Sequence, residues 1–245
     1  MSRSPASSAR KLAEEIRALV ARGDAGVRRW DVTRERLLDA SRKLVRASAS
    51  CIRDWHRGGV EAARWTDLDR QAEAILRDLD ASPEFRTAGF LQQALGEYAE
   101  ARLLSALSLS AVELPGLLPR LPVEALLLGA ADTIGELRRA LLDGLVAGRD
   151  GAAHAAFEQM ESLYDLLSDA EVPEALVGLR PKRDQARGIL GRTRGDLMTA
   201  KKTKDLEKRI DGLSSMLDEA ETRGKPKPKK AVSDDLDLDA AWSKK

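Results

Sequence analysis

Apolar residues recur at helical spacing along most of the sequence, and glycine and proline interrupt that spacing at intervals. The stretch 33–57 is an example, because Leu37, Leu44 and Ile52 fall on one side of a helix that would end at Gly58-Gly59. No alternating, β-branched run of strand length stands out, and aromatic residues make up only 4% of the chain. The pattern predicts an all-α protein.

Seven helices are expected from this punctuation, and the short connections predict a single bundle in which neighbours pack antiparallel. They fall at 7–21, 33–57, 61–80, 84–112, 122–147, 150–170 and from about 173 or 181 to 222 with an interruption. The predicted organisation is an N-terminal helix and flexible leader (1–30), a bundle core (31–200), a helical extension (201–223) and a disordered charged tail (224–245). The runs KPKPKK and DDLDLD in that tail cannot bury enough apolar surface to offset the entropy of ordering.

The single cysteine, Cys51, excludes an internal disulfide and any metal cluster built on several cysteines. Its place on an amphipathic helix favours a small buried side chain in a reducing compartment. The N-terminus MSRSPASSARK has no apolar core of signal-peptide length, and no uncharged stretch approaches the roughly 18 residues of a membrane helix. We therefore expect a soluble, cytoplasmic protein.

The formal net charge of +1 hides a segregation along the chain. Residues 1–64 carry 15 basic and 8 acidic side chains, residues 65–175 carry 8 and 20, and residues 176–245 carry 18 and 12. Two basic ends around an acidic middle are compatible with a basic surface beside an acidic site, and equally with solvated helix faces that bind nothing. Charge alone leaves both interpretations open.

Two predicted helices carry a pair of acids in an otherwise apolar setting. Asp132 and Glu136 lie four apart in GAADTIGELRR, and Glu97 and Glu100 lie three apart in GEYAEAR, so each pair shares a helix face. Burying like charges together is costly unless a cation lies between them. Four carboxylates form an all-oxygen ligand set, which suits a hard cation such as Mg²⁺, Mn²⁺ or Ca²⁺.

The alternative is that these acids form surface ion pairs with Arg102, Arg138 or Arg139, because acids at such spacing are common on exposed helix faces. A di-iron centre is disfavoured, since neither His56 nor His154 stands in a Glu-x-x-His motif. Spacing alone does not separate a metal site from ion pairs.

Four blocks resemble the translin family, in the order and with the approximate spacing that the family shows. They are RERLLDASRK continuing to CIRDWHR within 34–57, GEYAEA at 96–101, LLLGAADTIGELRR at 126–139, and LRPKRDQARGILGRTRGDL at 179–197. The resemblance spans roughly residues 30–200. It is nearest to the archaeal homomeric translins that are similar to translin-associated factor X (TRAX).

The resemblance implies a seven-helix bundle that assembles into an octamer-like homo-oligomer and binds single-stranded or structured RNA or single-stranded DNA. TRAX-like members are Mg²⁺-dependent endoribonucleases, and their acidic motifs correspond here to Glu97, Glu100, Asp132 and Glu136 as metal ligands and catalytic residues. Mn²⁺ is the alternative ion. A further acid found in some TRAX proteins corresponds to Ala94, so this chain lacks it.

Basic residues on the second predicted helix and in the 180–194 block are candidates for binding nucleic-acid phosphates. These are Arg42, Lys43, Arg46, Arg53, Arg57, Arg180, Lys182, Arg183, Arg187, Arg192 and Arg194. The candidate aromatic residues for base stacking, Trp55, Trp65 and Tyr98, suit a core equally well, so specific base readout is not indicated. Two other functions remain as alternatives, a non-catalytic nucleic-acid-binding scaffold and a structural helical interaction protein.

Overall fold

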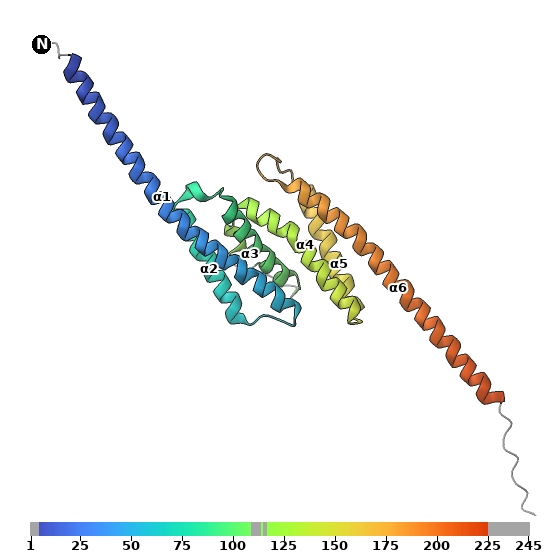
Figure 1. Ribbon diagram of the computed structural model, residues 1–245. Coiled ribbons are helices and arrows are strands. Elements are labelled where there is room, and N and C mark those ends of the chain that lie inside the picture. Colours follow the sequence, from blue (N-terminus) through green and yellow to red (C-terminus); the bar gives the residue numbers. More distant parts are fainter. Residues whose placement is uncertain (1–4, 109–113, 115–116, 225–245) are drawn as a thin grey trace, which may run out of the picture. The chain divides into compact units, whose positions relative to one another are not determined.

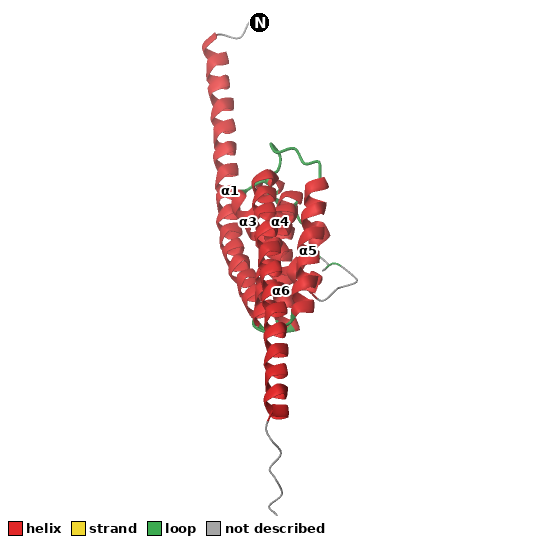
Figure 2. Cartoon of the chain, turned by 90° about the vertical axis from the view of Figure 1, so that its right-hand side faces the viewer, coloured by secondary structure: helices red, strands yellow, loops and turns green. Residues whose placement is uncertain are grey.

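A computed structural model describes residues 5–108, 114 and 117–224, and it is built from helices (Figures 1 and 2). They are α1 (Pro5–His56), α2 (Ala62–Ala81), α3 (Gly89–Ser108), α4 (Val123–Val146), α5 (Asp150–Asp169) and α6 (Leu179–Gly224), with the 3₁₀ turns η1 (Pro83–Phe85) and η2 (Leu118–Arg120). No strand occurs among those residues. The predicted all-α fold is confirmed.

The described residues form six helices where seven were expected, because the two predicted N-terminal helices form the single 52-residue helix α1. The expected break at Arg22-Gly23-Asp24 lies inside α1, and Asp31 is an interior residue rather than an N-cap. The reason is that the segment contains no proline to remove a backbone N–H. An interior glycine such as Gly23 costs only about 1 kcal/mol relative to alanine, which a long helix tolerates.

The last helix, α6, is also continuous, without the predicted interruption. The chain divides into two compact units, residues 1–195 and 196–245, and α6 contributes residues to both. The first unit contains α1 to α5 and the start of α6. Of the second unit, the structure describes the helical residues 196–224. The tail 225–245, predicted to be disordered, lies outside the described residues.

Helix α3 occupies the centre of the first unit, where it packs against α1, α2 and α4 (Figure 1). Its residues are apolar around most of the circumference, as a helix with several neighbours requires. Leu91, Leu95 and Leu104 are fully buried. Neighbours within the same chain therefore account for most of the apolar surface of α3.

Short connections define where α1 and α4 end. α1 ends at Gly58 and Gly59, whose φ angles of 125° and 135° are open to glycine and strained for other residues. Three residues, Ala147 to Arg149, join α4 to α5, so these two helices pack antiparallel.

Cys51 is buried in α1 with 2% of its surface exposed, as predicted. None of the described helices has the length and apolar character to cross a membrane.

Candidate functional site

Two glycines allow the helices that carry the acidic residues to approach closely. A Cβ atom at Gly129 of α4 would lie 2.5 Å from the carbonyl oxygen of Gly96 and 2.8 Å from Cβ of Ala99, both on α3. No side chain fits there, so backbone meets backbone at this crossing. Glu97 and Glu100 follow Gly96 along α3, and Asp132 and Glu136 follow Gly129 along α4. The contact thereby brings the two acid pairs into one region.

Each of the four acids is partly buried, and they act on one another electrostatically. Burial, followed by the charges of Asp132, Glu97 and Glu136, raises the pKa of Glu100 from 4.5 to about 8. Burial and the charges of Asp132 and Glu136 also raise the pKa of Glu97. Neither Glu97 nor Glu100 has a hydrogen-bonded or ion-paired side-chain partner within the described part of the chain. We call these four residues the acidic cluster.

The other two members of the acidic cluster each contact a basic side chain from a distant part of the sequence. Lys182, near the start of α6, places Nζ 2.5 Å from Oδ1 of Asp132. His56, at the end of α1, places Nε2 2.6 Å from Oε2 of Glu136. The hydrogen bond with His56 lowers the pKa of Glu136 despite its partial burial.

His56 is held between two carboxylates of the same helix. Its Nδ1 lies 3.7 Å from Oδ2 of Asp143, two turns beyond Glu136 on α4, and only 3% of the His56 side chain is exposed. The ring also packs edge-on against Trp55, with 4.8 Å between ring centroids. A buried imidazole with a carboxylate at each nitrogen has a fixed orientation, and it fixes Glu136 in turn.

The chemistry of the acidic cluster suits a hard divalent cation, because its donors are all carboxylate oxygens, and because burial together with neighbouring carboxylates raises the pKa of Glu97 and Glu100. The positions of the side chains are less favourable for binding a metal ion than their chemistry is. Among the described residues, no group of three or more His, Cys, Asp or Glu side chains is arranged to hold a metal ion. Lys182 and His56 each engage one acid, so ligation by all four requires side-chain rearrangement.

Comparisons with known proteins agree with this fold. No family model matches the sequence. An uncharacterised protein of Methanocaldococcus jannaschii is 33% identical over 177 residues, which is 69% of this chain and 77% of that protein. Among solved structures, AfC3PO in complex with duplex RNA is 27% identical with a TM-score of 0.57, over 82% of this chain and 98% of that one.

A second solved structure, a crystal structure of AfC3PO, has the same identity and coverage with a TM-score of 0.55. Apo-NeC3PO aligns with a TM-score of 0.61 at 23% identity, covering 82% of this chain and all of that one, which bears on the fold alone. These archaeal and fungal C3PO proteins are of the translin/TRAX type. The chain belongs to the translin family. Its acidic cluster therefore lies on a translin-type bundle, at the crossing of α3 and α4.

In this translin-type chain, the arginines considered as ion-pair partners of the acidic cluster mostly bind elsewhere. Arg102 lies on another side of α3, with Nε 3.3 Å from Oδ1 of Asp69 and its guanidinium 5.0 Å from the ring centre of Trp65. Arg138 donates a hydrogen bond of 2.6 Å to Oγ1 of Thr193 on α6. Nη1 of Arg139 lies 3.9 Å from Oε2 of Glu136. Simple surface pairing with these arginines does not account for the acidic cluster.

The basic candidates on α1 form a stripe. Arg42, Arg46 and Arg53 are spaced so that they lie within about one-ninth of the circumference of α1, Arg57 follows directly after the last residue of the helix, and all four are exposed. Helix geometry places the first three opposite the side that buries Leu44 and its neighbours. We call these four arginines the α1 basic stripe. Lys43 lies beside the stripe and forms an ion pair of 2.6 Å with Asp39.

The basic candidates of the 180–194 block are divided between several contacts. Arg183 and Arg187 donate hydrogen bonds to α5, to the carbonyl oxygen of Ser168 at 3.3 Å and to the hydroxyl oxygen of Tyr164 at 3.0 Å. Arg194 forms an ion pair with Glu161 of α5, with 2.5 Å between Nη2 and Oε1. Arg180 and Arg192 are exposed. Several of these residues thus bind α5 in this structure, and Lys182 belongs to the acidic cluster.

Sequence reasoning missed two residues of the site. His56 was considered only for a Glu-x-x-His motif, and its contact with Glu136 joins residues 80 positions apart. Lys182 was considered only as a candidate for phosphate binding, and its contact with Asp132 joins residues 50 positions apart. Both residues lie within the blocks that resemble translins, which is the one sequence signal that could have drawn attention to them.

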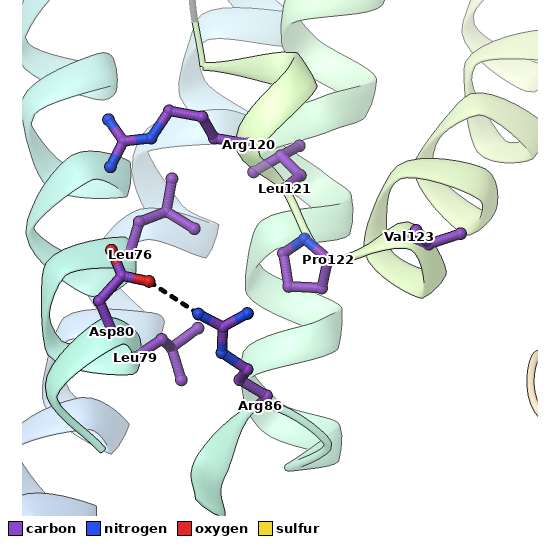
Figure 3. Close-up of a pocket in the computed structure, with 8 residues that line it drawn as sticks. All are labelled: Leu76, Leu79, Asp80, Arg86, Arg120, Leu121, Pro122 and Val123. Atoms are coloured by element: carbon purple, nitrogen blue, oxygen red, sulfur yellow. Dashed lines mark hydrogen bonds and ion pairs between the residues drawn. The ribbon is translucent and has the colours of Figure 1, made fainter. Parts of the chain in front are cut away.

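A separate pocket near the ends of α2 and η2 contains two arginines and none of the acidic cluster (Figure 3). Arg86 points toward Asp80, with 2.7 Å between Nη2 and Oδ1, and Arg120 pairs with Glu73 at 2.9 Å. Because a carboxylate satisfies each guanidinium, these arginines form part of the surface ion-pair pattern and are not assigned to a site.

Proposed function

We propose that this protein is a nucleic-acid-binding protein of the translin type and a Mg²⁺- or Mn²⁺-dependent endoribonuclease that cleaves single-stranded RNA within an even homo-oligomer such as an octamer. The observation that carries the proposal is the acidic cluster, in which Glu100 has a pKa of about 8 because burial and three neighbouring carboxylates oppose its charge. Perturbed carboxylates grouped on a partly buried surface are typical of catalytic metal sites.

A divalent cation bound by Glu97, Glu100, Asp132 and Glu136 would supply Lewis-acid activation of water and neutralise charge on the scissile phosphate. The protein's own side chains have separate roles. His56 holds Glu136 ionised and oriented through its 2.6 Å contact. Lys182 neutralises Asp132 in the metal-free protein, and its ammonium group is near enough to approach a phosphate oxygen when Asp132 turns toward a cation.

The α1 basic stripe is the proposed phosphate-binding surface, because the exposed guanidinium groups of Arg42, Arg46 and Arg53 follow one face of α1 and that of Arg57 follows at the turn after it. Support for RNA as the ligand comes from AfC3PO, whose solved structure contains duplex RNA. The double variant Arg46→Ala/Arg53→Ala should lower RNA affinity and reduce the dependence of log affinity on log salt by about 1.4 to 1.8. Arg77→Ala, at an exposed arginine of α2 outside the candidate set, is the matched control.

The deciding experiment incubates labelled single-stranded and duplex RNA with purified protein in Mg²⁺, in Mn²⁺ and in chelator. We expect cleavage of single-stranded RNA only with a divalent cation, and loss of cleavage with unchanged or tighter RNA binding in Asp132→Asn. Asp165→Asn, at an exposed acid of α5, controls for the change in net charge. Cleavage that persists in chelator, or that Asp132→Asn leaves intact, contradicts the proposed metal site.

A second candidate function is a nucleic-acid-binding scaffold without catalysis. One observation favours it: Lys182 and His56 already satisfy Asp132 and Glu136, leaving no metal-holding group of three among the described residues. The same experiment separates the two functions, since a scaffold binds RNA through the α1 basic stripe and releases no product with either ion.

A further inference from the structure

The part of α6 that lies in the second unit carries a line of exposed apolar side chains. Leu206, Ile210, Leu213 and Leu217 expose 58%, 52%, 62% and 67% of their surfaces. Their spacing of four, three and four residues keeps them on one side of the helix. Single exposed leucines are ordinary, whereas a continuous line at this spacing is the contact surface of a coiled coil. We call these four residues the α6 seam.

The residue types in the α6 seam select one kind of coiled coil. In heptad notation, Ile210 and Leu217 take the a positions and Leu206 and Leu213 the d positions. A β-branched residue at a with leucine at d favours two parallel strands, and the seam has this combination at its centre. Thr203 and Ala220 extend the a and d positions by one place at each end, so the whole seam is about 25 Å long.

The charges beside the α6 seam distinguish parallel from antiparallel pairing. Lys202 and Arg209 occupy the g positions, and Glu207 occupies an e position. In a parallel pair, each g residue faces the e residue five positions later in the other helix, so Lys202 faces Glu207 of the partner subunit, twice by symmetry. In an antiparallel pair, g faces g, which brings basic residues together. The sequence of charges is self-complementary in the parallel arrangement.

We propose that the partner of the α6 seam is a second copy of this chain, bound as a short parallel two-stranded coiled coil over residues 199–220. The seam is too short to hold two isolated helices together strongly. In each copy the α6 seam is attached to a folded protein. Any other contact between the two copies would therefore raise the local concentration of the second helix. This interface is independent of the acidic cluster and of any nuclease activity.

Thiol crosslinking in the full chain tests the arrangement. Thr203→Cys introduces a thiol at an a position near one end of the seam, where a parallel pair brings the two copies within disulfide reach and an antiparallel pair separates them by roughly 25 Å. Lys208→Cys, at the outward f position five residues away, is the matched control, and the native Cys51 is buried. We expect the disulfide-linked dimer to form at least about fivefold more in Thr203→Cys than in Lys208→Cys under mild oxidation.

Charge reversal in the Thr203→Cys background tests the partner. Lys202→Glu and Glu207→Lys should each lower the yield of linked dimer, and the double reversal should restore it, because only the double variant again sets opposite charges across a parallel interface. These side chains are on the surface, and circular dichroism checks that helicity is retained. Equal crosslinking of Thr203→Cys and Lys208→Cys, or a double variant no better than the single ones, overturns the proposal.

Discussion

Burial and three neighbouring carboxylates oppose the negative charge of Glu100. The folded, metal-free protein retains its proton up to a pKa of about 8, whereas the unfolded chain loses it near the ordinary value of 4.5. Between these values the folded state binds more protons, so the free energy of unfolding falls as pH rises. We expect Glu100→Gln to flatten this dependence and raise the free energy of unfolding near pH 8 by roughly 1–3 kcal/mol.

Urea unfolding with chelator, at pH values spanning this window, measures the difference, and Asp165→Asn is the control. If the acids were instead well-paired structural residues, Glu100→Gln would lower the stability at every pH. Added Mg²⁺ should reduce the pH dependence of the wild-type protein, because a bound cation favours the ionised carboxylate.

His56 acts on a second carboxyl group of the acidic cluster, that of Glu136, whose pKa is lowered rather than raised. Its contact with Glu136 keeps the pKa of that carboxyl low, so His56→Gln should raise this pKa toward or above its ordinary range. The loss of a buried charged contact should also cost roughly 1–3 kcal/mol of unfolding free energy. Carboxyl titration by NMR and urea unfolding measure the two effects. His154→Gln, at an exposed histidine of α5, should change neither.

At the level of elements, the α3–α4 crossing depends on the absence of a side chain at Gly129. A methyl group there would meet the Gly96 carbonyl oxygen at 2.5 Å, and backbone cannot move aside cheaply. We expect Gly129→Ala to lower the free energy of unfolding by about 1–3 kcal/mol. Gly135→Ala, in the same helix with open space around the new methyl group, should instead raise it by about 0.5–1 kcal/mol. Thermal or urea unfolding that ranks the two variants equally would show that the helices are less closely fitted than described.

At the level of the whole molecule, we predict that the protein assembles into an even homo-oligomer, an octamer in the translin pattern. The apolar surface of α3 gives no support to this prediction, because α1, α2 and α4 cover it. Family membership and the α6 seam remain as its support. Light scattering at micromolar concentration should find a mass well above the 26.7 kDa of one chain. A single species at the mass of one chain would contradict the prediction.

The charged tail provides the last prediction. Deleting residues 224–245 should leave folding and assembly unchanged, because KPKPKK and DDLDLD contain little that could join a core. RNA binding at low salt should weaken, since lysines that attract phosphate are lost. Melting temperature, mass and filter-binding affinity of the truncated chain measure these outcomes, and a large drop in melting temperature would mean that the tail docks.

The sequence by itself was sufficient for the properties that depend on local spacing. Helical periodicity predicted the all-α fold, and the spacing within GEYAEA and GAADTIGELRR predicted that Glu97 and Glu100, like Asp132 and Glu136, share helix faces. Four ordered blocks were enough to indicate the translin family. Helix ends were harder to predict from the sequence, because a glycine such as Gly23 ends a helix only when the surroundings favour a turn.

Tertiary structure alone decided which charges meet. His56 reaches Glu136 across 80 positions, and Lys182 reaches Asp132 across 50, since the C-terminal end of α1 and the start of α6 both contact α4. It also decided that Arg102 faces Asp69 instead of the acidic cluster. The physical reason is that spacing along a helix fixes only the direction of a side chain relative to its own axis. The partner it meets depends on how closely and at what rotation the helices pack, and for α3 and α4 the close approach is allowed by the contact of Gly129 with Gly96.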